Sequence, residues 1–117
     1  TIIIAGMGGN LVKKIIENSL EIACSAQEII LQPQSELHLI RSFLRENDFT
    51  IIREKMIFEG GKYYTIMKAV VGDDSETYDG YLEDEFGRCL MLSEDKVFMS
   101  YLDHKYQKLM YRCLPQA

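Results

Sequence analysis

A cluster of glycines behind a short apolar run is the first feature of this sequence that could serve chemistry. Residues 1–5 read TIIIA, and Gly6, Gly8 and Gly9 follow at once. Glycine allows the backbone to approach a ligand closely and leaves peptide N–H groups accessible to it. Ligands of open α/β sheets bind at the carboxyl ends of strands. The turn is therefore a candidate ligand site, and the alternative is that its glycines serve turn geometry alone.

Two carboxamides follow the second apolar run, residues 28–31, in the order Gln32-Pro33-Gln34. A carboxamide both donates and accepts hydrogen bonds, so it suits the edge of a base such as adenine. Carboxamides in loops also commonly bond to backbone groups, and the sequence leaves both uses open.

The same two segments disfavour a nicotinamide-dinucleotide site. Gly6 and Gly8 have the spacing of the first two glycines of that fingerprint, but Leu11 stands where the third would fall. The fingerprint also needs an acid after the next strand to hold the ribose, and Gln32 stands there instead.

Catalytic sets that depend on acid, base or metal groups are not recognisable. His38 and His104 are isolated, and no Ser–His–Asp, Cys–His, HExxH or phosphate-loop pattern occurs. The three cysteines have no CxxC spacing, so we expect no metal site and no disulfide framework, which fits a reducing cytoplasm. An enzyme built on these residues needs chemistry that depends on positioning more than on proton transfer. Methyl transfer fits that description.

Hydrophobic periodicity predicts the elements that must position the two turns. Each of the first two strands is followed by a helix, the first capped by Asn10 and the second running from a cap at Ser35 to Asn47, where a left-handed residue would end it. Two further strands, 49–58 and 62–71, flank a Gly-Gly turn and predict a hairpin. This order predicts an α/β sheet with parallel crossovers that ends in an antiparallel strand, as Rossmann-like methyltransferase sheets do.

Composition indicates one soluble-type globular domain, since 47% of the 117 residues are hydrophobic and 26% are charged. No apolar run reaches the roughly 18 residues that a membrane span needs. Charge is uneven: residues 73–95 carry nine acids against one base, whereas residues 96–117 carry four bases and one acid. We therefore divide the chain into an α/β part over 1–72, a solvated acidic connector over 73–92 and a helical segment over 93–117.

The last segment begins with Ser93, Glu94 and Asp95, which predict a helix start. Its apolar stripe is expected to pack against the domain or a partner helix, and consists of Val97, Phe98, Tyr101, Leu102, Leu109 and Met110.

Several segments together resemble the TrmK-type bacterial tRNA (adenine-N1)-methyltransferases, which modify adenine 22. The resemblance covers residues 1–81 and rests on TIIIAGMGGNLV, EIILQPQSELHLIRSFLRENDFTI, EGGKYYTIMKA and YDG. It implies an S-adenosylmethionine-binding Rossmann-like domain followed by a helical domain. It also implies that this chain starts at the fourth strand of the sheet, so that the N-terminal cofactor-binding half is missing and the piece alone is inactive.

Site residues follow from the resemblance. It implies that Gly6, Met7, Gly8 and Gly9 form the catalytic loop beside the reactive methyl group, and that Ala5, Gly6 and Met7 contact the cofactor. It implies that Gln32 and Pro33 bind the substrate adenine. Gln34 departs from the family, where Asn is frequent.

We further expect Gly8 to be required because a side chain there would intrude on the site or forbid a positive φ. An exposed sheet edge also predicts self-association. The rival interpretation is a non-catalytic interaction module or an inactive methyltransferase-like protein.

Overall fold

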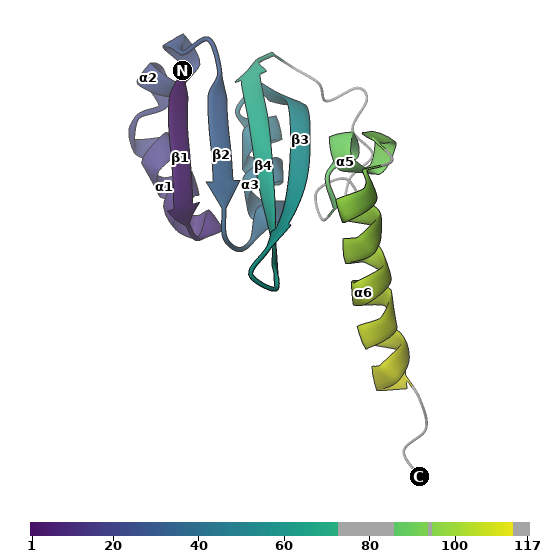
Figure 1. Cartoon of the computed structure of the whole chain (residues 1–117). Coiled ribbons are helices and arrows are strands. Elements are labelled where there is room, and N and C mark those ends of the chain that lie inside the picture. Colours follow the sequence, from purple (N-terminus) through teal and green to yellow (C-terminus); the bar gives the residue numbers. More distant parts are fainter. Residues whose placement is uncertain (73–85, 94, 114–117) are drawn as a thin grey trace.

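The computed structural model describes residues 1–72, 86–93 and 95–113, with side chains as far as residue 107. One sheet of four strands forms its centre, and helices lie on one face of that sheet and beside one of its edges (Figure 1). The strands are β1 (Ile2–Met7), β2 (Ile29–Pro33), β3 (Phe49–Glu59) and β4 (Lys62–Val71), and the helices are α1 (Gly9–Asn18), α2 (Leu20–Ser25), α3 (Leu37–Glu46), α5 (Arg88–Ser93) and α6 (Lys96–Cys113).

The strand order in the sheet is β1-β2-β4-β3, and the directions of the strands confirm the predicted α/β architecture. β1 and β2 pair in parallel, with Ile2 opposite Ile29 and Ile4 opposite Leu31. β4 lies between β2 and β3 and runs antiparallel to both. The hairpin of β3 and β4 is therefore present as predicted. Its second strand, β4, is the one that runs antiparallel to the other strands of the sheet.

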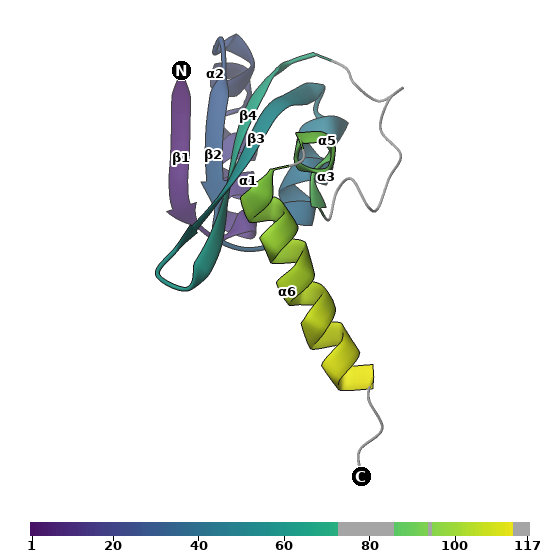
Figure 2. The ribbon, with the colours of Figure 1, turned by 45° about the vertical axis from the view of Figure 1, so that its right-hand side comes forward.

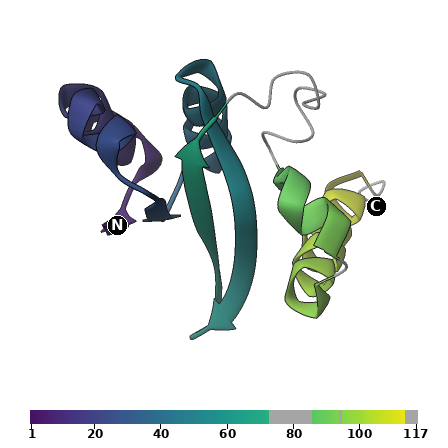
Figure 3. The same ribbon diagram turned by 90° about the horizontal axis from the view of Figure 1, so that it is seen from above.

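Helices α1 and α3 cover one face of the sheet, as the view from above shows (Figure 3). Isoleucine, leucine and methionine side chains on that face are buried beneath them, because alternate strand residues point to the same side. Burial of this apolar surface is the main stabilising term for the sheet. The cluster consists of Ile4, Val12, Ile16, Ala23, Ile29, Leu31, Ile40, Phe43, Leu44, Phe49, Met67 and Ala69.

The starts of both covering helices differ from the sequence prediction. α1 begins at Gly9 with Gly8 at the N-cap, and α3 begins at Leu37 with Glu36 at the N-cap. Asn10 and Ser35 were wrongly predicted as caps because, as described below, their side chains bond across to the neighbouring turn.

The end of α3 was predicted only in part. Asn47 is the C-cap residue as expected, but its φ is −106°, and the left-handed residue is the next one, Asp48, at φ 62°.

Helices α5 and α6 pack beside β3, at the edge of the sheet opposite to β1, and α6 projects past the hairpin (Figure 2). Asp95 caps α6, since its Oδ1 accepts the N–H groups of Val97 at 2.8 Å and Phe98 at 3.0 Å. Ser93 is instead the last residue of α5. Of the predicted start signal Ser93–Asp95, Asp95 is therefore the residue that caps α6.

The predicted apolar stripe of α6 is confirmed where the structure describes it. Phe98 is buried together with Met56 and Leu90, and Val97, Tyr101 and Leu102 pack against them. Leu109 and Met110 have side chains outside the described residues.

The segment predicted as a solvated acidic connector, 73–92, is described only at its end, because residues 73–85 lie outside the described residues. The described end forms most of α5, and its Leu90 is fully buried. This part of the segment is therefore packed structure and not a solvated loop. The division of the chain into three segments stays a prediction.

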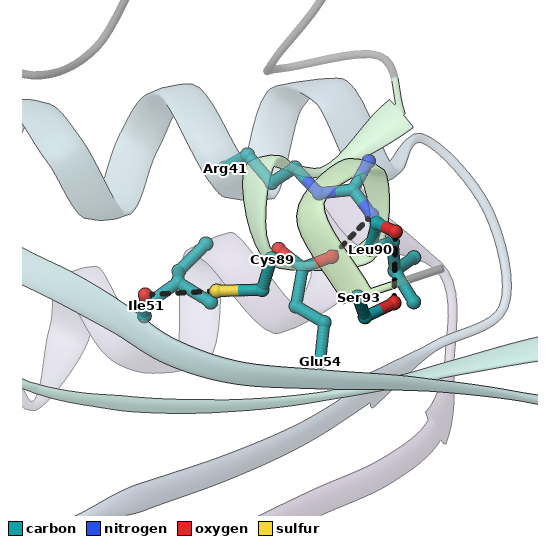
Figure 4. Close-up of polar contacts among 6 residues, drawn as sticks. All are labelled: Arg41, Ile51, Glu54, Cys89, Leu90 and Ser93. Carbon is teal, nitrogen blue, oxygen red and sulfur yellow. Dashed lines mark hydrogen bonds and ion pairs between the residues drawn. The ribbon is translucent and has the colours of Figure 1, made fainter. Parts of the chain in front are cut away.

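A buried ion pair holds the region where α3, β3 and α5 meet (Figure 4). Arg41 Nη2 lies 3.1 Å from Glu54 Oε2, and both side chains are only 1% exposed. Gly87, directly before α5, has φ +85°, and a Cβ there would collide with both side chains. Cys89 Sγ donates to the carbonyl of Ile51 at 3.4 Å and so ties α5 to β3.

Candidate functional site

The candidate site lies at the carboxyl ends of the neighbouring strands β1 and β2. Because the two strands are parallel, the turn from β1 into α1 and the turn from β2 into α3 lie side by side at the same end of the sheet. These are the two turns on which the sequence placed the catalytic loop and the substrate-binding residues.

Two hydrogen bonds join the strand ends. The N–H of Gly6 donates to Oε1 of Gln32 at 3.0 Å, and the N–H of Gln34 donates to the carbonyl of Met7 at 2.8 Å. The carboxamide of Gln32 therefore serves a backbone group, which was one of the two uses left open. No hydrogen bond of its Nε2 with another described residue is present, so this donor points to no partner within the described part of the chain.

Two further contacts join the helix starts. The N–H of Gly9 donates to Oγ of Ser35 at 3.4 Å. Nδ2 of Asn10 lies 3.2 Å from Oε1 and 3.0 Å from Oε2 of Glu36. Together with the strand-end bonds, these contacts link the two turns directly.

The glycines of the first turn have different roles. Gly6 has φ +76° with nothing within 4 Å of a Cβ, so its conformation favours glycine and its surface is open. A Cβ on Gly9 would lie 2.5 Å from the carbonyl oxygen of Ser35 and 2.8 Å from that of Glu36, so Gly9 allows the close approach of the two turns.

The expectation of a positive φ at Gly8 was wrong. Gly8 has φ −64° and ψ 157°, an extended conformation that any residue adopts. A Cβ there would lie 3.0 Å from Oγ of Ser35, which is a side-chain atom. The positive φ expected at Gly8 belongs to Gly6, and the tightest backbone approach belongs to Gly9.

Exposure divides the predicted site residues into two groups. Ala5 and Gly6 are exposed, and Met7, Gly8 and Gln32 are half-buried, so they have surface to offer a ligand. Gly9 and Pro33 are buried and have little surface to offer a ligand. Sequence reasoning did not identify Asn10, Ser35 and Glu36 as members of this junction, because a polar residue before a helix is equally typical of an ordinary cap.

The electrostatics of the junction are simple. Glu36 is the one titratable residue among 5–10 and 32–36. The two described acids with a shifted pKa lie elsewhere: a hydrogen bond from Lys68 is the main cause that lowers the pKa of Glu28, and burial raises the pKa of Glu54. The junction therefore consists mainly of oriented backbone and carboxamide groups, which suit chemistry that depends on positioning.

Neither a metal centre nor a membrane span emerges from the described residues. They contain no group of three His, Cys, Asp or Glu side chains that could hold a metal ion. Within the same residues, no helix has the length and apolar character to cross a bilayer.

Comparison with known families then identifies the fold. Residues 1–114 match the family model described as TrmK: tRNA (adenine(22)-N(1))-methyltransferase. The chain belongs to this family, which confirms the resemblance seen in its sequence.

Individual relatives agree with that assignment. The chain is 37% identical over 79 residues to the tRNA (adenine(22)-N(1))-methyltransferase of Bacillus subtilis (strain 168), a match that covers 68% of this chain and 33% of the relative. The crystal structure of the B. subtilis m1A22 tRNA methyltransferase TrmK superposes with a TM-score of 0.78 at 30% identity, over 94% of this chain and 48% of that one.

A second solved structure, Streptococcus pneumoniae Sp1610 in complex with S-adenosyl-L-methionine, superposes with a TM-score of 0.85 at 30% identity. The superposition covers 95% of this chain and 50% of Sp1610. The chain thus spans about half the length of these solved relatives and a third of the curated one. Its sheet is the Rossmann-like methyltransferase sheet that the element order predicted.

Proposed function

We propose that this chain supplies one half of the methyl-transfer domain of a tRNA (adenine-N1)-methyltransferase that uses S-adenosylmethionine and acts on adenine 22. The observation that carries the proposal is the junction of the two turns, where exposed backbone at Gly6 and the carboxamide of Gln32 lie within one hydrogen bond of each other. Family membership and the cofactor complex of Sp1610 support the same assignment.

The residues at the end of β1 fit one side of such a cofactor. The backbone around Ala5 and Gly6 is exposed, and the space beside Gly6 is empty where a side chain would stand. In the proposal Ala5, Gly6 and Met7 contact the cofactor, and Gly6 to Gly9 form the loop beside the methyl group. When bound, S-adenosylmethionine supplies a methyl group activated on a sulfonium.

The second turn serves the acceptor in this proposal. Gln32 and Pro33 would hold the adenine, with Nε2 of Gln32 available to an acceptor atom of the base and Pro33 as buried support. N1 of adenine carries its own lone pair, so it would need no base on the protein to accept the methyl group, and S-adenosylhomocysteine would be the leaving group. Positioning of the two reactants can supply about 7–11 kcal/mol of the barrier. Because N1 is hidden in a paired base, the adenine must be unpaired or flipped out.

The proposal extends to the substrate, the cellular location and self-association. The substrate is tRNA, and because tRNA is found in the cytoplasm, the protein is expected there too. Self-association is supported by exposed apolar side chains on the sheet, where Ile3 is 68% exposed and Ile52 49% exposed, and a single sedimenting monomer would contradict it.

The test uses the full-length protein that carries this chain and a tRNA transcript. We expect N1-methylation at adenine 22, detected by mass spectrometry, and loss of methylation when that adenine is replaced. Gly8→Val should lower turnover at least about tenfold, because about 1.4 kcal/mol of lost positioning suffices for that factor. Cys24→Val, on exposed α2 at the opposite end of the sheet, is the matched control and should leave turnover unchanged.

Two results would overturn the assignment. Absence of methylation together with absence of S-adenosylhomocysteine binding in calorimetry would favour a non-catalytic module. Unchanged turnover of Gly8→Val would remove this loop from the mechanism, and a fall in melting temperature that matches the loss of turnover would reduce the glycine to a structural role.

A further inference from the structure

Asn10 and Glu36 form a polar contact between the starts of two helices that lie 26 residues apart in the sequence. The amide nitrogen of Asn10, in the first turn of α1, lies 3.2 and 3.0 Å from the two carboxylate oxygens of Glu36, at the N-cap of α3. A hydrogen bond to a charged acceptor is stronger than one between neutral groups.

The residue that supplies the carboxylate, Glu36, has an unfavourable backbone conformation. Glu36 has φ 55° and ψ 43°, the left-handed region that a residue with a side chain rarely adopts. Its side chain makes no capping bond to α3. The backbone carbonyl of Glu36 accepts the N–H of Leu39 at 3.0 Å and so starts α3, whereas its carboxylate bonds to the neighbouring turn.

The same place is the tightest backbone contact between the turns. Gly9 packs against the carbonyl oxygens of Ser35 and Glu36, with no room for a Cβ. Asn10 and Glu36 lie directly beside that contact, so their bond limits sliding of one turn past the other. Strain that persists beside a candidate site indicates a functional constraint.

We propose that Asn10 and Glu36 are positioning residues that set the separation between the methyl-donor turn and the adenine turn. This inference rests on the proposed function. Neither side chain touches the reacting atoms. A misplacement of about 1 Å at a reacting centre can cost about 100-fold in rate, so a small shift between the turns is enough to affect turnover. Both side chains are exposed, and an exposed polar pair contributes little to stability.

The experiment measures methyl transfer by the full-length protein with Asn10→Ala, Glu36→Ala and the double variant. We expect kcat to fall about tenfold in each single variant and no further in the double, because either change breaks the same contact. KM for tRNA and the affinity for S-adenosylhomocysteine should change less than twofold. Glu36→Gln keeps one acceptor oxygen for Asn10 and should retain most of the turnover. Glu46→Gln, an exposed change at the other end of α3, should match wild type.

A second readout does not depend on activity. Amide hydrogen exchange of residues 5–10 should become faster in Asn10→Ala and Glu36→Ala, while exchange in β4 stays unchanged. Glu36→Gly removes the carboxylate but suits a positive φ, so it should keep or raise the melting temperature and still lose turnover.

Additive losses in the double variant, or unchanged kcat and unchanged exchange in both single variants, would overturn the inference. An inactive wild-type protein would instead contradict the proposed function, and the exchange experiment would still decide whether the contact holds the turns.

Discussion

Two junctions hold this molecule together by different physical means. The junction of the β1–α1 and β2–α3 turns is polar, lies at the surface and is closed by backbone and side-chain hydrogen bonds. The junction of α3, β3 and α5 is buried and contains the ion pair of Arg41 and Glu54. In the first, loss of a contact is compensated by water. In the second, a charge that loses the other member of the pair cannot turn to water in its place, because both side chains are buried. The comparison indicates that surface contacts here set geometry and buried contacts set stability.

The largest effect is expected from breaking the buried pair on one side. Glu54→Met leaves the Arg41 guanidinium buried without its carboxylate, and the guanidinium cannot lose its charge, so stability should fall by about 3–5 kcal/mol in urea unfolding. Arg41→Met should cost less, since Glu54 can become neutral by taking up a proton. The double variant Arg41→Met/Glu54→Met should recover most of the loss, and equal losses in all three would contradict this account.

The next effect concerns Gly87, where α5 meets the pair. Gly87→Ala places a methyl group against both charged side chains at φ +85°, so we expect about 2–4 kcal/mol of destabilisation. Displacement of α5 should also expose Cys89, which bonds to β3 in the native state. Faster thiol labelling of Cys89 in a Cys24→Ser/Cys113→Ser background would report it, and wild-type labelling kinetics would count against the packing described here.

At the surface junction the matching change is Gly9→Ala. Its Cβ would meet two backbone carbonyl oxygens, which cannot rotate away as a side chain does, so we expect about 1–3 kcal/mol of destabilisation. Gly6→Ala has open space and only its φ of +76° opposes it, so about 1 kcal/mol is expected. Thermal melts of the two variants give the order, and a larger loss for Gly6→Ala would contradict the assigned roles.

The smallest expected effect is a pH dependence that belongs to the buried junction alone. Burial raises the pKa of Glu54 above its ordinary value of 4.5, so the folded state binds the proton more tightly than the unfolded state. Stability from this group is therefore fully present below pH 4.5 and declines as pH rises through the raised pKa. Glu54→Gln should remove this decline, which unfolding curves over a pH series would show, whereas Glu36→Gln should leave it in place.

The sequence located the two turns that meet at the ends of β1 and β2, but it did not reveal the contacts between their side chains. AGMGG after an apolar run was enough to locate the first turn, and Gln32-Pro33 located the second. Asn10 and Ser35 were interpreted as caps of their own helices, since local sequence contains no sign that a partner turn lies beside them. The positive φ was expected at Gly8 but occurs at Gly6, because a row of glycines does not show which one carries it.

The sequence by itself determined the order of the four strands and of helices α1, α3 and α6, the parallel pairing of β1 with β2 and the antiparallel hairpin. These depend on local quantities, namely the period of apolar residues, the glycines at turns and the length of the connections. Tertiary structure alone decided that Arg41 and Glu54 meet, that the end of an acidic segment forms the packed helix α5, and that Glu36, in a left-handed conformation, contacts Asn10. Each of these depends on which surfaces face each other after folding, and burial, partner distance and strain have no value until the chain is packed.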